Sequence, residues 1–251
     1  MTGPLDRRGL VQTSLLGTGA AALAATVPAG AALAQGVGPA TAQGSSAPPP
    51  AARQAPYAVK PLPFDPQRIR GMSERILVSH HENNYGGAVR RLNSIADQLA
   101  SLDYERAPTF VVNGLKREEL IATNSMILHE LFFDGLGEES RPGPALLEAL
   151  ARDFGSPERW RAEFMAMGRA QGGGSGWVLL TWSPRDRRLV NAWAADHTTT
   201  LAGGTPILAL DMYEHAYQMD FGARAGGYVD AFMAAIRWQN AGRLYEQVSK
   251  A

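Results

Sequence analysis

Hydrophobic positions recur at helical intervals in the first half of the folded part of the chain. Between residues 71 and 103 they follow one another every three to five residues, with Ser73 as the expected N-cap. Gly86-Gly87 inside this stretch predicts a kink or a close backbone approach, because glycine is unfavourable in a helix interior. A second helix is expected from about Lys116 to Phe133. Two long helices with one connection predict a helical hairpin.

The second half of the chain alternates short helical and strand-like patterns. Apolar runs rich in β-branched and aromatic residues predict three strands, and the five residues "SPRDR" predict a turn between the first two. The expected elements are helices over 144–154, 156–170 and 228–248 and strands over 177–182, 188–194 and 206–212. The fold class is therefore α+β: a helical hairpin domain (57–140) followed by an α/β domain (141–251) with a small three-stranded antiparallel sheet.

The N-terminus has the pattern of an export signal. Arg7-Arg8 precedes a long Ala/Gly/Leu stretch, and Ala32-Leu33-Ala34 fits a signal-peptidase site. Residues 1–34 are expected to be a twin-arginine-type signal peptide, and 35–56 a Pro/Ala-rich linker. This predicts a periplasmic protein with no membrane contact after cleavage. The alternative is an uncleaved membrane anchor.

Composition narrows the chemistry. The 251 residues contain 24 Lys plus Arg and 24 Asp plus Glu, and this balance does not favour a nucleic-acid partner. Cysteine is absent, which excludes disulfides, thiolate metal sites and cysteine nucleophiles. Any metal must therefore be bound by nitrogen and oxygen atoms.

Three histidines lie in apolar helical or strand-end surroundings. His215 follows Asp211 by four residues at the end of a predicted strand, so a turn there can direct both side chains to one point. His80 and His129, one on each hairpin helix, can reach that point from the other side. Taken singly, a histidine of this kind is more typical of a hydrogen-bonded core residue. Together, three imidazoles and one carboxylate suit iron, manganese or zinc.

Four motifs in order around these residues resemble those of the iron/manganese superoxide dismutase family. They are "SHHENNYGGAVRRLN" at His80, "NSMILHELFFDGL" at His129, "GSGWVLL" at Trp177 and "DMYEHAYQMDF" at Asp211 and His215. The last is similar to the family signature Asp-x-Trp-Glu-His-Ala-Tyr-Tyr, with Tyr213 and Gln218 in place of the tryptophan and the second tyrosine. The resemblance extends from Leu62 to Gln247.

The resemblance implies a superoxide dismutase that converts superoxide to dioxygen and hydrogen peroxide by one-electron cycling of one iron or manganese ion per subunit. It implies a homodimer or a tetramer, in which Glu214 reaches the ligand corresponding to His215 in the partner subunit. It implies Tyr217 as a catalytic residue, and Trp177 and Phe133 as aromatic screens. The implied metal ligands are His80, His129, Asp211 and His215.

Several family positions differ in this chain. Asn84 and Gln218 stand where the family has a histidine and a tyrosine that pair across the dimer, and two amides can also hydrogen-bond each other. Ala88 replaces a tyrosine of the substrate funnel. Asn83 and Ala225 replace a lysine and an arginine that attract the anion.

The group that hydrogen-bonds the solvent on the metal is a further expectation. The family usually supplies a glutamine, either four residues before the second histidine or from the connection before the Asp signature. Ser125 occupies the first place and is too short to reach. The connection "AADHTTTLAGGTP" has no glutamine, and His197 takes its position if a two-residue deletion is allowed. His197 is therefore expected to be catalytic; the alternative is a surface-loop histidine without a role.

Two other functions fit parts of the pattern. One is a non-enzymatic metal-binding family member that has lost turnover together with its altered funnel. The other is a zinc hydrolase, but "HELFFD" from His129 has no second histidine at the spacing of His-Glu-x-x-His. The intact set of three histidines and one aspartate favours the dismutase.

Overall fold

The structure is a computed structural model that describes residues 56–138 and 140–250. The predicted signal peptide and almost all of the linker lie outside the described residues. All described residues belong to the second of two contact units, 48–251. The predicted domain boundary at residue 140 stays a prediction.

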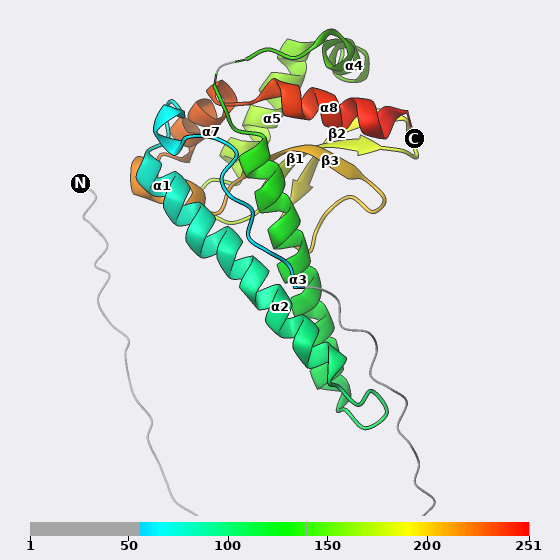
Figure 1. Cartoon of the computed structure of the whole chain (residues 1–251). Coiled ribbons are helices and arrows are strands. Elements are labelled where there is room, and N and C mark those ends of the chain that lie inside the picture. The colour runs from blue at the N-terminus through cyan, green and yellow to red at the C-terminus, as the bar shows by residue number, and fades with distance from the viewer. Residues whose placement is uncertain (1–55, 139, 251) are drawn as a thin grey trace, which may run out of the picture. The chain divides into compact units, whose positions relative to one another are not determined.

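The first arm of the hairpin is one rod built from three helical segments (Figure 1). Ser73 is the N-cap, as predicted, and its hydroxyl accepts a hydrogen bond from the backbone N–H of Ile76 at 3.2 Å. The segments are α1 (Glu74–Ser79), the π-helix η2 (His80–Tyr85) and α2 (Gly86–Ala100). A π-helix has a wider turn than an α-helix and is often found at functional sites. Here it begins with His80.

The glycine pair at the start of α2 follows directly on the π-helix η2. A Cβ atom on Gly86 would lie 3.1 Å from a guanidinium nitrogen of Arg90. The carbonyl oxygen of His81 would lie 3.5 Å away, so the close neighbours of Gly86 come from the turns before and after it in the same arm.

The second arm is α3 (Thr109–Asp134), which begins earlier than the predicted Lys116. Its N-cap is Pro108, after a short connection at the tip of the hairpin. The two arms bury Leu92, Ile95 and Leu99 between them and continue into the main core. The hairpin thus extends the core and brings one histidine from each arm to the same level.

The three predicted strands are confirmed. β1 (Trp177–Ser183) lies between β2 (Arg188–Ala194) and β3 (Thr205–Asp211), and both pairings are antiparallel. All seven residues of β1 are buried. The register pairs Trp177 with Asp211, so the first residue of β1 lies beside the last residue of β3.

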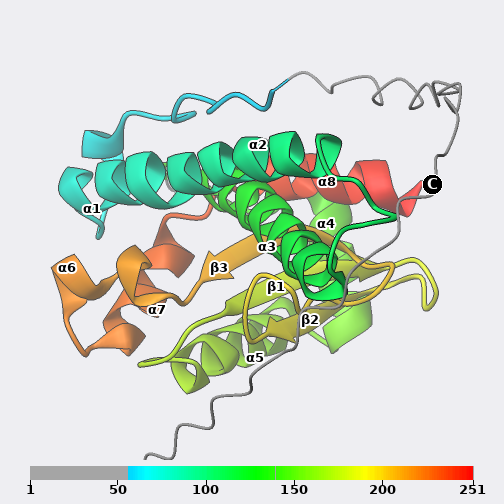
Figure 2. The same cartoon turned by 90° about the horizontal axis from the view of Figure 1, so that it is seen from below.

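Helices cover the sheet on both sides (Figure 2). The hairpin helix α3 packs on β3, whereas α5 (Pro157–Ala170) packs on β1 and β2. The helix α4 (Pro144–Phe154) lies against α5 and β2. The order hairpin, sheet, helix confirms the predicted α+β class and places the end of β3 next to α3.

The single C-terminal helix predicted over 228–248 is wrong. The chain forms α7 (Ala225–Ala234) and α8 (Trp238–Ser249), after the short η3 (Glu214–Ala216) and α6 (Gln218–Phe221). The break between α7 and α8 has a long-range cause. The N–H of Gly137 donates to the carbonyl of Ala235 at 2.9 Å, and the N–H of Arg237 donates to that of Gly135 at 2.7 Å. This pairing replaces the helical hydrogen bonds there.

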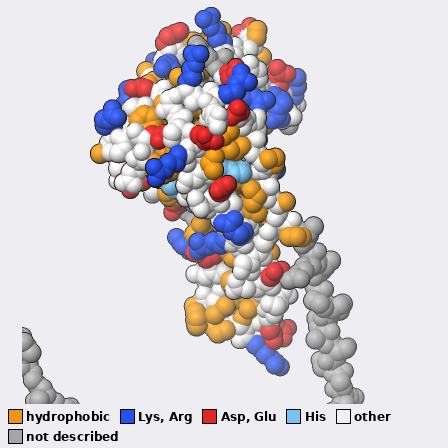
Figure 3. Space-filling view, turned by 60° about the vertical axis from the view of Figure 1, so that its left-hand side comes forward, with side chains coloured by type: hydrophobic (Ala, Val, Ile, Leu, Met, Phe, Trp, Pro, Cys, Tyr) orange, Lys and Arg blue, Asp and Glu red, His pale blue; other side chains and the backbone are white. Residues whose placement is uncertain are grey.

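The surface mixes both charge signs. On the face in Figure 3, basic and acidic side chains are interspersed, and histidine side chains reach the surface. Of the helices in the described part of the chain, none combines the length and the hydropathy needed to span a bilayer.

Candidate metal centre

Four side chains from separate parts of the fold meet at one buried point, and we call them the four-residue group. One is at the start of η2, one on α3, one at the end of β3 and one in η3. They are His80, His129, Asp211 and His215, and one ligand-type atom from each lies within 4.8 Å of the others.

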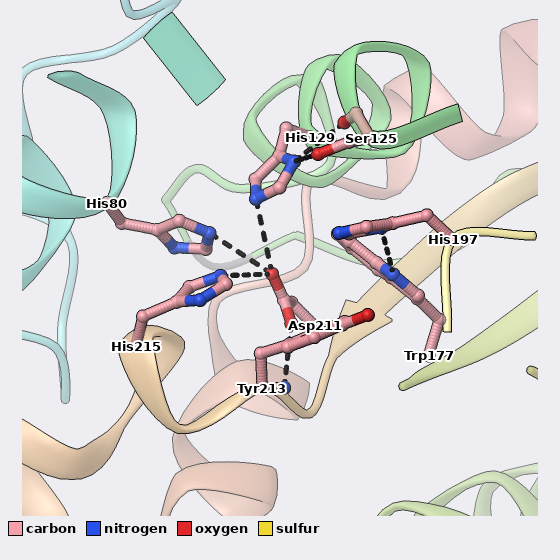
Figure 4. A network of polar contacts seen from close by, with 8 residues as sticks. All are labelled: His80, Ser125, His129, Trp177, His197, Asp211, Tyr213 and His215. Atoms are coloured by element: carbon pink, nitrogen blue, oxygen red, sulfur yellow. Dashed lines mark hydrogen bonds and ion pairs between the residues drawn. The ribbon is translucent and has the colours of Figure 1, made fainter. Parts of the chain in front are cut away.

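The group has the geometry of an inward-facing donor set (Figure 4). The Nε2 atoms of all three histidines point at the Oδ2 atom of Asp211, at 3.1 Å for His80, 3.5 Å for His129 and 3.2 Å for His215. Ligand atoms that share a metal at about 2.0–2.2 Å lie about this far apart. The separations therefore fit one ion among the four groups.

Unpaired buried nitrogen atoms support this fit. The Nε2 atoms of His80 and His129 are fully buried and have no hydrogen-bond partner among the described residues. A buried polar atom without a partner costs about 1–3 kcal/mol. A cation between the four side chains would satisfy both nitrogens.

The arrangement also sets the protonation states that a cation needs. Burial lowers the pKa of His80, and it lowers the pKa of His129 to about 3. Burial opposes ionisation of Asp211, but the close polar contacts of its carboxylate with His215 and His80 outweigh burial and hold the pKa of that carboxyl well below its usual range. The group thus combines neutral imidazoles at His80 and His129 with one carboxylate anion.

The helix itself orients His129. Its Nδ1–H donates to the carbonyl of Ser125, one turn earlier, at 2.6 Å. The proton is then on Nδ1, so the lone pair of Nε2 faces the group. A partner of this kind, which fixes the tautomer of a histidine, is typical of metal sites. The Ser125 hydroxyl oxygen also lies 3.3 Å from Nδ1 of His129.

Aromatic rings enclose the group. The ring centres of Phe132 and Phe133 lie 5.0 and 5.1 Å from that of His80, and the Trp177 ring meets His129 edge-on at 5.2 Å. All three rings are buried. Buried rings therefore line the hairpin side and the sheet side of the group, and the screening role of Phe133 and Trp177 stays a prediction.

The structure places His197 beside the group. The indole Nε1–H of Trp177 donates to Nδ1 of His197 at 3.0 Å, and the ring centre of His197 is 5.8 Å from that of His129. An indole N–H can only donate, so Nδ1 must be unprotonated and the neutral ring carries its hydrogen on Nε2. Burial lowers the pKa of His197, which favours this neutral form. The Nε2 atom points toward the four-residue group (Figure 4).

The other predicted residues lie further out. Tyr217 is buried, but its phenol oxygen accepts from the N–H of Gly173 at 3.1 Å and its ring stacks on Tyr228. Glu214 and Gln218 are exposed, and Asn84 is half-buried. No hydrogen bond between Asn84 and Gln218 occurs within the described part of one chain. Their predicted contact across a dimer, and the role of Tyr217, stay predictions.

Two residues that contact His197 were not expected from the sequence to belong to the site. Asn124 donates its side-chain N–H to the carbonyl of His197 at 2.6 Å and so anchors the connection between β2 and β3 to α3. Tyr213 stacks on His197 with ring centres 4.8 Å apart and on His215 at 5.3 Å. In the sequence, only nearness to a predicted ligand points to these two residues: Asn124 precedes His129 on the same helix, and Tyr213 lies between Asp211 and His215.

The buried histidines predict how the metal-free chain responds to acid. The folded state keeps His129 neutral down to a pKa of about 3, whereas the unfolded chain protonates it near 6.5. Below pH 6.5 the unfolded state therefore binds more protons, and the free energy of unfolding should fall as the pH falls. Urea unfolding of metal-free protein at about pH 7.5, 6.0 and 4.5 tests this. A midpoint that stays constant over this range would contradict it, and His129→Asn should make the dependence shallower.

Comparison with known proteins gives a consistent assignment. Residues 142–244 match the family model described as "Iron/manganese superoxide dismutases, C-terminal domain". The chain is 66% identical over 185 residues to "Superoxide dismutase [Fe]" of Cupriavidus metallidurans, covering 74% of this chain and 94% of that protein. It is 34% identical over 200 residues to "Superoxide dismutase [Mn] 1" of Halobacterium salinarum, covering 77% and 97%.

A third relative is more distant in sequence. The chain is 31% identical over 194 residues to "Superoxide dismutase [Fe]" of Aquifex pyrophilus, covering 74% of this chain and 90% of that protein. The relatives match nearly their whole length and carry the names of one activity, with either metal. These matches agree with the buried four-residue group, which suits one iron or manganese ion. The chain belongs to the iron/manganese superoxide dismutase family and is a metal-dependent oxidoreductase of that class.

Proposed function

We propose that the chain dismutates superoxide with iron, and that His80, His129, Asp211 and His215 hold one iron ion per subunit. The observation that carries this proposal is the convergence of three Nε2 atoms on Oδ2 of Asp211. The choice of iron over manganese is supported by the relative at 66% identity, whose name specifies iron. The relatives named for manganese are about half as similar, at 34% identity.

When bound, iron supplies the one-electron oxidation of one superoxide to dioxygen and the one-electron reduction of a second to peroxide. The protein determines the charge and the surroundings of that chemistry. Asp211 contributes one negative charge at full burial. Phe132 and Phe133 keep bulk water away from His80. The low dielectric strengthens every electrostatic interaction in the site.

Reduction of superoxide to hydrogen peroxide consumes two protons, so a proton donor must face the reacting oxygen atoms. His197 is the residue suited to this role. Trp177 donates a hydrogen bond to Nδ1 of His197, and the Nε2–H of His197 is directed toward the four-residue group. An imidazole held in one tautomer can donate to a substrate or solvent oxygen and so affect the reduction potential.

The binding site can be tested directly. Diffraction data collected just above and just below the iron absorption edge should differ by one anomalous peak per chain, surrounded by the four side chains. A peak at any other place, or a peak that follows the manganese edge in protein from its own host, would contradict the proposal.

The two alternative functions are less well supported. The names of the relatives argue against the non-enzymatic alternative, although Ala88 replaces the funnel tyrosine. For a zinc hydrolase, Phe133 occupies the place of the second histidine after His129. Glu130, which would be the base, instead contacts Lys60 and accepts a hydrogen bond from the phenol of Tyr85.

We further propose that the active form is a homodimer. Glu214 is exposed beside His215, whose side chain is 26% exposed whereas the other members of the group are buried. A partner subunit could supply the missing cover, with each Glu214 bonded to His215 of the partner subunit.

This assembly predicts a specific effect of Glu214→Ala. The variant should dissociate at a higher protein concentration than the parent chain and should lose metal faster to a chelator, because a partner contact to His215 is lost. Light scattering over a dilution series and chelator-release rates measure both. Glu246→Ala removes an exposed acid of α8 and is the matched control. A monomeric parent chain at micromolar concentration would contradict the proposal.

We also propose that the chain acts in the periplasm, after export by the twin-arginine route. Support comes from Arg7-Arg8 and Ala32-Leu33-Ala34 in the sequence. Changing both arginines to lysine should leave the protein in the cytoplasm, because this route reads the arginine pair. Cell fractionation and mass spectrometry of the N-terminus measure the outcome.

A matched control for the export test is Arg53→Lys, which makes the same change within the predicted linker and should leave export intact. An exported form that begins before residue 35 would contradict cleavage after Ala34 and favour a membrane anchor.

A further inference from the structure

His197 lies in irregular backbone and needs to be held in place. The connection between β2 and β3 has an exposed stretch from Thr199 to Gly203. The side chain of Asn124 fixes the backbone of the connection at the His197 carbonyl. Trp177 fixes one ring nitrogen at 3.0 Å. A ring held by its backbone and one hydrogen bond can still tilt about that bond.

Tyr213 supplies the remaining restraint. Its ring is nearly parallel to that of His197, with a 14° angle between planes and centres 4.8 Å apart. The other ring neighbours of His197 within the described residues meet it at steep angles, 47° for His129 and 50° for Trp177. A face-to-face neighbour prevents the tilt that would turn Nε2 away from the four-residue group.

Tyr213 is itself tied to that group. Its backbone N–H donates to Oδ1 of Asp211 at 2.8 Å, while Oδ2 of the same carboxylate faces the three histidines. Its ring also stacks on His215, at 5.3 Å and 15°. The rings therefore form one stack in the order His197, Tyr213, His215 (Figure 4). Asp211 contacts two members of this stack, through the backbone N–H of Tyr213 and the Nε2 atom of His215.

From this geometry we infer that Tyr213 is a positioning residue for the dismutation reaction: it acts through His197, by holding the imidazole plane so that Nε2 faces the reacting oxygen atoms. This inference rests on the proposed role of His197. Tyr213 need not touch substrate for this purpose, because its aromatic ring stacks directly on the imidazole.

The inference is tested on iron-loaded protein with Tyr213→Leu, Tyr213→Phe, His197→Ala and the double variant Tyr213→Leu/His197→Ala. Iron per chain, the midpoint potential of the iron and the dismutation rate are measured for each. Tyr213→Leu should keep its iron, shift the potential and lose about tenfold or more in rate, as is typical when a residue that orients an active-site group is removed. Tyr213→Phe retains the ring and should restore the parent potential and most of the rate.

The double variant decides whether Tyr213 acts through His197. If it does, Tyr213→Leu should change neither the potential nor the rate further once His197 is alanine, because effects on one shared pathway are not additive. An equal shift in both backgrounds would overturn the inference and assign the effect to the contact with His215. An unchanged potential in Tyr213→Leu alone would also overturn it.

A crystal structure of Tyr213→Leu gives an independent readout, in which the His197 ring should be tilted so that Nε2 no longer faces the four-residue group. A ring that stays in place would overturn the inference even if activity falls. The failure of the proposed function has a different signature. If His197→Ala leaves both potential and rate unchanged, His197 is not the proton donor, and the inference falls with that assignment.

Discussion

A chain with Asp211 replaced by alanine should lose its metal and its dismutase activity together. Oδ2 of Asp211 is the point on which three imidazole nitrogens converge, and this carboxylate is the one anionic member of the four-residue group. Removal of a residue that only orients a metal ligand costs about 10–100-fold in affinity or activity. Loss of the charged ligand itself should cost more. His129→Ala should behave in the same way.

Metal per chain and dismutation rate, measured on the same preparation, test this prediction. Asp211→Asn preserves the shape and removes the charge, which separates loss of a ligand from collapse of the site. Asp230→Ala is a matched control, because Asp230 makes an exposed ion pair with Arg169, and such pairs contribute little. Full metal occupancy in Asp211→Ala would refute the assignment of the four ligands.

His197→Ala should give the opposite combination, with most of the metal retained and most of the activity lost. The side chain lies next to the four-residue group without belonging to it, so the ion should keep its ligands. The rate should fall by about 10–100-fold, and the midpoint potential should shift, because a hydrogen-bond donor facing the site is removed.

Two further variants sharpen this second prediction. His197→Gln places an amide donor in the same connection and should recover part of the rate. Thr200→Ala changes an exposed position further along the same connection and should have no effect. Unchanged turnover and potential in His197→Ala would show that His197 is the surface-loop histidine without a role that the sequence left open.

Much of the fold follows from local pattern. The strands were predictable because they are apolar runs bounded by turn residues, and Ser73 because a serine before an apolar run is a typical N-cap. The interval of five residues between His80 and Tyr85 is also a local signal, and it corresponds to the π-helix η2. The break between α7 and α8 was not predictable. No glycine or proline marks residues 235–237, and the cause is pairing with Gly135 and Gly137, far earlier in the chain.

The candidate site also has a part that was predictable from the sequence and a part that was not. The four-residue group was predictable because each member is a metal-binding residue type in a recognisable motif. The role of Trp177 in fixing the tautomer of His197, and that of Tyr213 in stacking on it, depend on how β1, β3 and the connection meet in space. Ring planes and hydrogen-bond directions have no counterpart in sequence periodicity. The sequence could place His197 near the metal only through an alignment that allows a two-residue deletion.

The central claim is that one iron ion, held by these four residues, is responsible for dismutation. The most direct measurement is titration of metal-free parent protein with iron and, separately, with manganese, with dismutation rate plotted against metal bound per chain. We expect the rate to rise in proportion to iron up to one ion per chain, and manganese at equal occupancy to give much less. A rate that is independent of bound metal, or that rises only with manganese, would contradict the account.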